Sequence, residues 1–179
     1  MSGHLQKLKM LLLFFVRLRK IVKRKFWTAV VKKTCNKYGK GLTVNAKSMI
    51  GGNVTLGENC NFNGMNISGG GGVYIGNNFH SAPKCEIIVQ YHNYDKGKTI
   101  PYDDTVITKN VIIEDNVWIG YHVMILGTVR IGEGAIIQAG SVVVTDIPKC
   151  AIAGGNPARV FKMRNIEHYE KLKSLGKFH

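Results

Sequence analysis

The sequence predicts an all-β solenoid with three short strands per coil, and three observations support this fold class. Apolar residues recur every six positions, glycine is abundant with 21 residues, and proline is scarce with 4. An α-helix would space its apolar residues about 3.6 positions apart, and an exposed strand would alternate them by two. A period of six fits neither, but it fits one short strand and one tight corner per hexad, with about 18 residues per triangular coil.

The repeat is most regular in the second half of the chain. Seven consecutive hexads begin with a β-branched residue: Ile107, Ile113, Ile119, Ile125, Ile131, Ile137 and Val143. The residues four positions later are nearly all small or β-branched: Val111, Val117, Val123, Val129, Ala135, Ser141 and Ile147. We expect the first set to point into the core and the second to fill the angles of a narrow prism.

The same period continues upstream, with one irregular corner. Two further coils are led by Ile50, Leu56, Phe62, Ile75, Ser81 and Ile87. The inward fifth position of these hexads holds Cys60, Phe79, Cys85 and Tyr91. The glycine run from Gly69 to Gly72 falls between the two coils and predicts a looped-out or distorted corner.

The repeat stops between His92 and Ile107, which predicts an outward loop over residues 93–106. Such interruptions of a solenoid commonly carry function. After Pro148 the pattern ends, and the apolar spacing within 163–176 predicts a closing helix. We therefore expect a helical extension over residues 1–40, the solenoid over 41–150 and a C-terminal segment over 151–179.

The positive charge is concentrated at the N-terminus. The formal net charge is +14, but residues 1–40 hold twelve Lys or Arg and no Asp or Glu, which leaves about +2 for the rest. A protein that binds nucleic acid would carry a basic face with interleaved aromatic residues, and the solenoid has no such stripe. We therefore expect no nucleic-acid partner.

The N-terminal segment has the pattern of an amphipathic helix. Apolar residues recur at steps of three and four: Leu5, Leu8, Leu12, Phe15, Leu18, Val22 and Phe26. The longest apolar run, Met10 to Val16, is too short to cross a bilayer. Two interpretations remain open, because the helix could pack on its own protein or a neighbouring subunit, or could bind an anionic membrane surface.

The cysteines indicate neither a metal site nor a disulfide framework. Cys35, Cys60, Cys85 and Cys150 show no CxxC or Cys/His spacing, and no signal peptide precedes them. We expect reduced, mostly buried thiols in a cytoplasmic protein, peripheral on the inner face of the membrane if the N-terminal helix binds lipid.

Four motifs, in this order and spacing, resemble those of the hexapeptide-repeat acyltransferases: YHNYD at 91–95, VIIEDNVWIG at 111–120, IIQAGSVV at 136–143 and GGNPARVFK at 154–162. The resemblance covers about residues 50–165 and is to the branch that holds the maltose and galactoside O-acetyltransferases and the streptogramin (xenobiotic) acetyltransferases. It implies a left-handed parallel β-helix, a homotrimer, and acetyl-CoA bound between neighbouring prisms, with no metal.

The resemblance also implies roles for particular residues. His92 matches the catalytic histidine, and an imidazole suits this role because it can take and return a proton near neutral pH. Asp95 and, after one residue of slippage, Asn63 match acceptor-binding positions. The implied cofactor contacts are Trp118, Tyr121, Ala139, Gly140, Val144, Thr145, Arg159 and Lys162.

Several of these residues also have a structural interpretation. Asn63 suits a corner because asparagine tolerates left-handed φ, and Ala139 and Gly140 are typical of tight turns. Trp118 would serve as packing at a subunit interface. Tyr121 departs from the resemblance, because several relatives place glycine there.

We favour an O-acetyltransferase acting on a sugar or a glycan precursor. The alternatives are N-acetylation of a nucleotide-linked amino sugar and acetylation of an antibiotic hydroxyl. A zinc-dependent γ-type carbonic anhydrase would use His80, His92 and His122, but their spacing does not match that family. A non-catalytic solenoid for assembly or binding would leave His92 and the pair Arg159 and Lys162 without a role.

Overall fold

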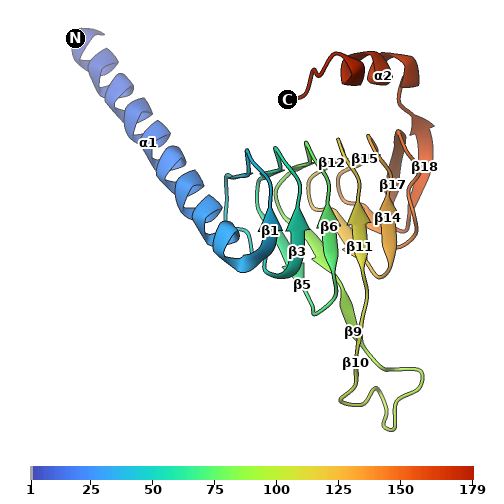
Figure 1. The fold of residues 1–179 in the computed structure, drawn as a ribbon. Helices are drawn as coiled ribbons and strands as arrows, with labels where there is room; N and C mark the ends of the chain where they lie inside the picture. The colour runs from blue at the N-terminus through green and yellow to red at the C-terminus, as the bar shows by residue number, and fades with distance from the viewer. Residues whose placement is uncertain (1) are drawn as a thin grey trace.

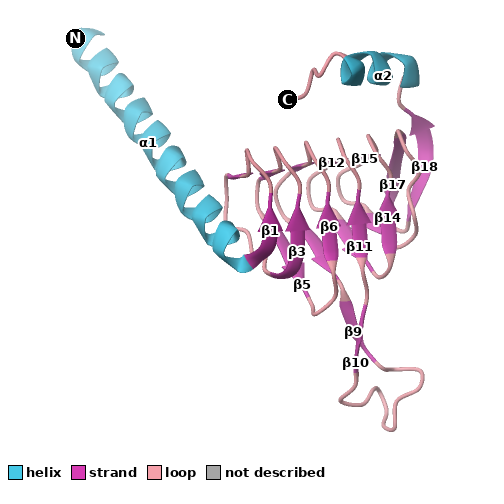
Figure 2. Cartoon of the chain, in the orientation of Figure 1, coloured by secondary structure: helices cyan, strands magenta, loops and turns pink. Residues whose placement is uncertain are grey.

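The computed structural model describes residues 2–179 and shows a left-handed parallel β-helix (Figures 1 and 2). The five-stranded sheet consists of β1 (Cys35–Tyr38), β3 (Gly52–Leu56), β6 (Val73–Ile75), β11 (Val111–Ile113) and β14 (Val129–Ile131). The four-stranded sheet consists of β5 (Met65–Ser68), β8 (Cys85–Ile88), β13 (Met124–Leu126) and β16 (Val142–Val143). The seven-stranded sheet consists of β2 (Thr43–Val44), β4 (Asn61–Phe62), β7 (His80–Ser81), β12 (Trp118–Ile119), β15 (Ile136–Ile137), β17 (Ala151–Gly155) and β18 (Ala158–Met163).

The hexad pattern predicts the core correctly along most of the solenoid. The leading residues stack by parallel pairing, as Leu56, Ile75, Ile113 and Ile131 do in the five-stranded sheet. All four are buried, and so are the small residues at the corners, such as Ala135 and Ser141. Most coils therefore bury one apolar side chain per side, with Ser81 as a polar exception, and this stack is the repeating unit of stability in such a fold.

The expectation for Ile107 and Tyr91 is wrong. These residues pair with each other in an antiparallel ribbon formed by β9 (Gln90–His92) and β10 (Val106–Thr108), and both are only partly buried. The coil repeat resumes at Val111 instead of Ile107. A ribbon that leaves the prism can keep the six-residue phase by coincidence, because its alternation by two divides six.

The three sheets meet at three corners, which we name in chain order. The first corner leads from the five-stranded to the seven-stranded sheet, the second from the seven-stranded to the four-stranded sheet, and the third from the four-stranded sheet back to the five-stranded sheet. The turn at Gly69 to Gly72 and the ribbon β9–β10 both leave from the third corner, between β5 and β6 and between β8 and β11. The ribbon points away from the prism (Figure 1).

A ladder of asparagines runs along the first corner. Asn59, Asn78 and Asn116 all have positive φ, and the side-chain amide of each of the first two donates to the next, at 3.0 and 2.9 Å. The helix α2 (Ile166–Ser174) closes this ladder, because the Tyr169 hydroxyl accepts a hydrogen bond from Asn116 at 2.9 Å. The closing helix is shorter than the expected 163–176, since Met163 belongs to β18.

The helix α1 (Ser2–Thr34) leads into β1 and leaves the solenoid at an angle (Figure 1). Its last turns pack on the first coil, where Val31 is buried and the Thr28 hydroxyl accepts from the Val44 amide at 2.9 Å. Within residues 2–179, no helix combines the length and the apolar character that a bilayer crossing requires.

Candidate functional site

His92 ends the first strand of the outward ribbon. Its backbone lies opposite Val106, and its side chain is exposed. The imidazole stacks on the Tyr102 ring, with 4.0 Å between the ring centroids and 12° between the planes. Face-to-face contact with a second ring restricts the imidazole to few orientations, so the ribbon holds His92 exposed and oriented.

The loop after His92 is ordered by its own backbone hydrogen bonds. The Asp103 carboxylate accepts from the Thr105 amide at 2.9 Å and from the Lys98 amide at 3.0 Å, and these bonds lower the pKa of Asp103. Asp95 is exposed in the same loop, three residues after His92. The excursion therefore presents the carboxylate of Asp95 and the imidazole of His92, and the hydrogen bonds of Asp103 hold its loop in shape.

Asn63 lies at the second corner, and its amide is used within the fold. Its Oδ1 accepts from Asn45 Nδ2 at 3.0 Å, and its Nδ2 donates to the Ser81 carbonyl at 2.8 Å. These bonds connect consecutive coils. The structure does not bring Asn63 to the ribbon that carries His92, because the two leave from different corners of the prism.

Trp118 lies on the outer face of the seven-stranded sheet and is 52% exposed. Its register neighbours are His80 and Ile136. Three residues further, at the second corner, the Tyr121 backbone carbonyl accepts a hydrogen bond from the Gly140 amide at 2.8 Å, and the Tyr121 ring is exposed. The structure therefore places Trp118, Tyr121 and Gly140 on one side of the prism.

The second corner is close-packed between consecutive coils. A Cβ atom at Gly120 would lie 2.6 Å from the Ala139 amide nitrogen, so only glycine permits this approach. Ala139 and Gly140 are both exposed, and they add little side chain to the corner. Apart from the exposed ring of Tyr121, this corner therefore carries little side-chain bulk.

The remaining predicted residues lie at two other places. Val144 and Thr145 are exposed at the third corner, the same corner from which the ribbon of His92 leaves. Arg159 and Lys162 are exposed on β18, which pairs antiparallel with β17 and places them opposite Gly154 and Ile152. Their positive charges therefore lie at the end of the seven-stranded sheet that carries Trp118.

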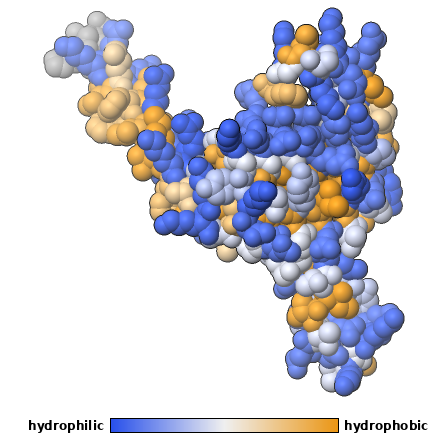
Figure 3. Space-filling view, in the orientation of Figure 1, coloured by the Kyte–Doolittle hydropathy of each residue, from blue (hydrophilic) through white to orange (hydrophobic). Residues whose placement is uncertain are grey.

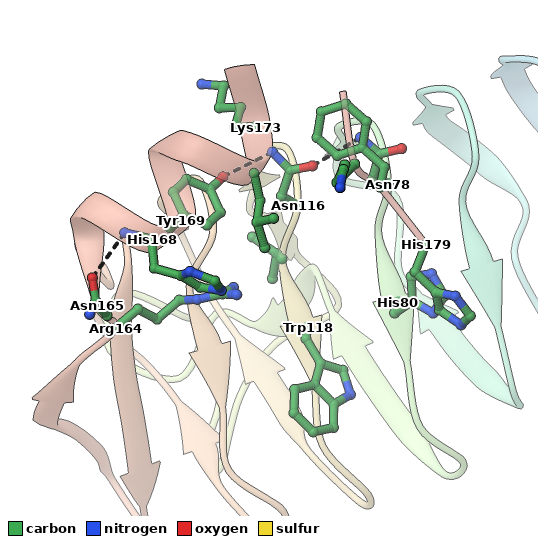
Figure 4. A pocket seen from close by; sticks show the side chains of 14 residues that line it. Asn78, His80, Asn116, Trp118, Arg164, Asn165, His168, Tyr169, Lys173 and His179 are labelled. Atoms are coloured by element: carbon green, nitrogen blue, oxygen red, sulfur yellow. Dashed lines mark hydrogen bonds between the residues drawn. The ribbon is translucent and has the colours of Figure 1, made fainter. Parts of the chain in front are cut away.

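A cavity of about 450 Å³ lies between α2 and the outer face of the seven-stranded sheet (Figure 4). Trp118 and His80 form part of its floor, and Arg164, His168 and Lys173 line it from the C-terminal segment. The sequence analysis missed this cavity. His80 and Trp118 stand directly before Ser81 and Ile119, the inward residues that lead their hexads. Because they share this position in consecutive coils, the repeat could have predicted that they lie side by side.

His80 is shielded by the C-terminal segment. Its ring stacks on His179 with centroids 5.3 Å apart, and Nε2 is buried without a hydrogen-bond partner (Figure 4). Burial lowers the pKa of His80, because it disfavours the imidazolium. His80 is therefore held neutral at the wall of the cavity.

The three histidines of the carbonic anhydrase alternative do not meet within the chain. His80 lies on β7, His92 on the ribbon and His122 at the second corner. Among residues 2–179, no three His, Cys, Asp or Glu side chains are grouped to hold a metal ion.

The predicted residues thus form two groups on different sides of one prism. His92, Asp95, Val144 and Thr145 lie at or beyond the third corner, whereas Trp118, Tyr121, Ala139 and Gly140 lie on the seven-stranded sheet and the second corner. The four-stranded sheet separates the two groups. A single chain does not bring them together.

Comparison with known proteins finds relatives that carry the same hexapeptide repeat. The family model described as "Bacterial transferase hexapeptide (six repeats)" matches residues 110–145. The galactoside O-acetyltransferase of Lactococcus lactis is 34% identical over 136 residues, which cover 64% of this chain and 65% of that protein. The galactoside O-acetyltransferase of Escherichia coli is 36% identical over 125 residues, covering 66% and 59%. The chain therefore spans less than two thirds of the length of these curated relatives.

Solved structures show the same fold. A galactoside acetyltransferase in complex with coenzyme A superposes with a TM-score of 0.69 at 31% identity, covering 79% of this chain and 71% of that chain. A maltose O-acetyltransferase from Clostridium difficile superposes with a TM-score of 0.62 at 30% identity, covering 75% and 73%.

The prism, the single outward ribbon and the close-packed second corner define a solenoid protein of the left-handed β-helix class. Within this class, the chain belongs to the hexapeptide-repeat acyltransferase family.

Proposed function

We propose that the chain is an acetyl-CoA-dependent O-acetyltransferase that acts on a sugar or a glycan precursor, with His92 as the general base. The observation that carries this proposal is the imidazole of His92, exposed on a long excursion of the solenoid and held against Tyr102. The named activities of the galactoside and maltose O-acetyltransferases support the donor and the type of acceptor.

The chemistry requires one proton to move twice. The acceptor hydroxyl attacks the thioester carbonyl while His92 takes its proton, and the C–S bond then breaks. The departing thiolate of coenzyme A takes the proton from His92, so the base is regenerated. Backbone amides near the reacting carbonyl would stabilise the negative charge on its oxygen.

The residues of the second group fit acetyl-CoA. The exposed face of Trp118 offers apolar contact for the pantetheine arm, and the edge formed by Gly120 and Ala139 lets that arm approach the backbone. Arg159 and Lys162 supply cations for the phosphates. Tyr121 places a bulky ring at this edge, so we propose that it contacts the cofactor by its side chain.

We propose that the working site lies between two chains of a homotrimer. His92 of one chain and Trp118 of the next would then face the same groove, which the separation of the two groups within one chain supports. Val144 and Thr145 would border this groove from the third corner. A cyclic trimer repeats the same interface three times, so it would contain three equivalent sites.

For the acceptor, we propose that Asp95 contributes a hydrogen bond, because its carboxylate is exposed three residues from His92. The amide of Asn63 is already committed to Asn45 and Ser81, which supports a structural role for it. We also propose a cytoplasmic location, which the four unpaired cysteines of the chain support.

The test is acetyl-CoA consumption against a panel of sugars, nucleotide-linked amino sugars and antibiotics. We expect turnover with a sugar hydroxyl and a loss of about 10²- to 10⁴-fold in kcat for His92→Ala. Lys171→Ala on α2 is the control, since it removes an exposed side chain that lies outside the cavity beneath α2 and away from the ribbon, and it should keep its activity. Full activity of His92→Ala would refute the role of His92, and failure to bind acetyl-CoA would favour a binding module.

A further inference from the structure

Among the described residues, α1 packs on the solenoid through its C-terminal end. Val31 is buried, Trp27 is partly buried, and the Thr34 hydroxyl donates to the Ile50 carbonyl. Side chains from residue 5 to residue 26, in contrast, are exposed. Most of α1 therefore projects from the body without packing on it (Figure 1).

The projecting part of α1 carries large apolar side chains. Leu5 is 72% exposed, Leu12 64% and Phe15 55%. Figure 3 shows apolar surface along this helix. Exposed apolar surface of this extent marks an interaction site in a protein that stays in solution, because water penalises it.

The same part of α1 is strongly basic. Eight of the ten basic residues of α1 lie on it, namely Lys7, Lys9, Arg17, Arg19, Lys20, Lys23, Arg24 and Lys25, whereas Lys32 and Lys33 lie on the packed end. The first acidic residue of the chain is Glu58. None of the ion pairs found among the described residues involves α1. The charge of the helix is therefore available to an anionic partner.

The apolar and basic side chains are arranged around the helix. At about 100° per residue, Leu8, Phe15, Val22 and Phe26 fall on one face, and most of the basic side chains other than Arg19 fall on the flanks and the opposite face. The exposed side chains of Leu13, Phe14 and Ile21 extend the apolar surface to the other sides of the helix. A shallow groove on the first face is lined by apolar Phe15, Leu18, Val22, Phe26 and Trp27 together with basic Arg19 and Lys23. This is the pattern of a helix that lies in the plane of a membrane interface.

We propose that residues 5–26 of α1 bind the surface of an anionic lipid bilayer. The apolar face enters the boundary between headgroups and acyl chains, and the basic flanks contact the anionic headgroups. The helix lies on the bilayer without crossing it, in agreement with its lack of a sufficiently apolar stretch within the described residues. The solenoid then stays in water beside the membrane, held by the packed end of α1.

Charge favours lipid over a second copy of the same helix. Two copies of α1 packed along their apolar faces would bring twenty cationic side chains together, ten from each copy, with no acidic residue on either helix to compensate. Like charges at close range repel, whereas an anionic bilayer neutralises them. An anionic bilayer surface offers both an apolar layer for the apolar side chains and negative charge for the basic ones.

The test is co-sedimentation of the full chain with vesicles of phosphatidylcholine alone or with one quarter phosphatidylglycerol. We expect at least tenfold tighter binding to the anionic vesicles, and weaker binding as salt is raised. Replacing Arg17, Arg19, Lys20 and Lys23 by glutamine should abolish this preference. Phe15→Ser with Val22→Ser should weaken binding about tenfold or more with the charge unchanged.

The matched control replaces Lys32, Lys33, Lys37 and Lys40 by glutamine, because it removes the same charge from the packed end of α1 and from β1 and the turn that follow it. This variant should bind anionic vesicles like the wild type. Equal binding to neutral and anionic vesicles, no binding, or equal losses in both four-residue variants would overturn the proposal. A fall in oligomer size for Phe15→Ser with Val22→Ser, measured by light scattering without lipid, would assign α1 to a second copy instead.

Discussion

The contact between His92 and Tyr102 joins two residues that lie ten positions apart, across an irregular loop. The planes are 12° from parallel and the centroids are 4.0 Å apart, so the phenol ring covers one face of the imidazole. Because the His92 side chain remains exposed beside this contact, Tyr102 can orient His92 without burying it. We regard Tyr102 as a positioning residue for the proposed base.

Tyr102→Ala is expected to lower kcat about tenfold or more, because a freely rotating imidazole spends less time aligned with the acceptor. The KM for acetyl-CoA should stay unchanged, and Tyr102→Phe should keep wild-type activity, since the phenyl ring still stacks. Steady-state kinetics measure both values. The upfield NMR shift of the His92 ring protons should vanish in Tyr102→Ala and persist in Tyr102→Phe; a shift that persists in both would contradict the contact.

Tyr169 connects the helix α2 to the asparagine ladder of the first corner. Its ring covers Gly134, where a Cβ atom would lie 2.7 Å from the ring. Its hydroxyl donates to Glu133 at 2.8 Å and accepts from Asn116 at 2.9 Å. Burial and the neighbouring carboxylate of Glu133 raise the pKa of Tyr169, so the hydroxyl stays protonated and can donate.

Tyr169→Phe is expected to destabilise the fold by about 1–3 kcal/mol, because Asn116 and Glu133 lose a partner in a partly buried place. Urea unfolding measures this difference. The ring would still cover Gly134, so the structure of the solenoid should not change. An effect below about 0.5 kcal/mol would show that water replaces the hydroxyl at no cost.

At the scale of elements, α2 is held to the prism by a small charged network. The Glu133 carboxylate forms ion pairs with Lys173 and with Lys149, the latter at 3.4 Å. Lys149 also forms an ion pair with Glu170 at 2.7 Å. Burial alone would raise the pKa of Glu133, but hydrogen bonds from Lys173 and Tyr169, together with the charge of Lys149, more than offset it, so the pKa is lowered. Ionised Glu133 therefore stabilises the folded state.

This shift predicts how stability depends on pH. A carboxyl group with a depressed folded pKa contributes stability above its unfolded pKa, and that contribution is lost as the pH falls through the folded value. Glu133→Gln should lower the Tm at pH 6–7, and the difference from the wild type should vanish below about pH 3. Glu167→Gln, in the first turn of α2, is the control without this network. A difference that persists at low pH would exclude ionisation as its source.

At the scale of the whole molecule, the two groups of predicted site residues lie on different sides of the prism. The proposed trimer unites them, and mixed trimers can test it. His92→Ala and Trp118→Ala should each be strongly impaired as homotrimers. Co-expressed in equal amounts, they should recover about a quarter of wild-type activity, because one interface in four then combines an intact His92 with an intact Trp118.

Recovery must be compared with a mixture of the two variants purified separately and not allowed to exchange, which should stay inactive. If verified mixed trimers recover nothing, the site does not lie between chains. If a single chain proves active as a monomer, the proposed assembly is wrong.

Much of the fold could be predicted from the sequence, because a solenoid is a local repeat. Ile113, Ile119 and Ile125 each meet the same environment one side further along the coil, so period alone identifies them as core. Period alone wrongly predicted Ile107 and Tyr91 as core residues. They lie in the ribbon, where side chains alternate by two, and this alternation keeps the same six-residue spacing. The stack of Tyr102 on His92 could not be predicted, because loop 93–106 has no repeat to define which rings meet.

The amino-acid sequence by itself determined most of the hexad core, the outward loop over residues 93–106 and the basic, apolar character of α1, because these depend on spacing and composition along the chain. Only the tertiary structure decided which face each residue shares with distant ones: the cavity beneath α2, the Asn59–Asn78–Asn116 ladder closed by Tyr169, and the separation of His92 from Trp118. The physical reason is that a coil brings together residues about 18 positions apart, whereas α2 and the ribbon bring together residues whose separation follows no period.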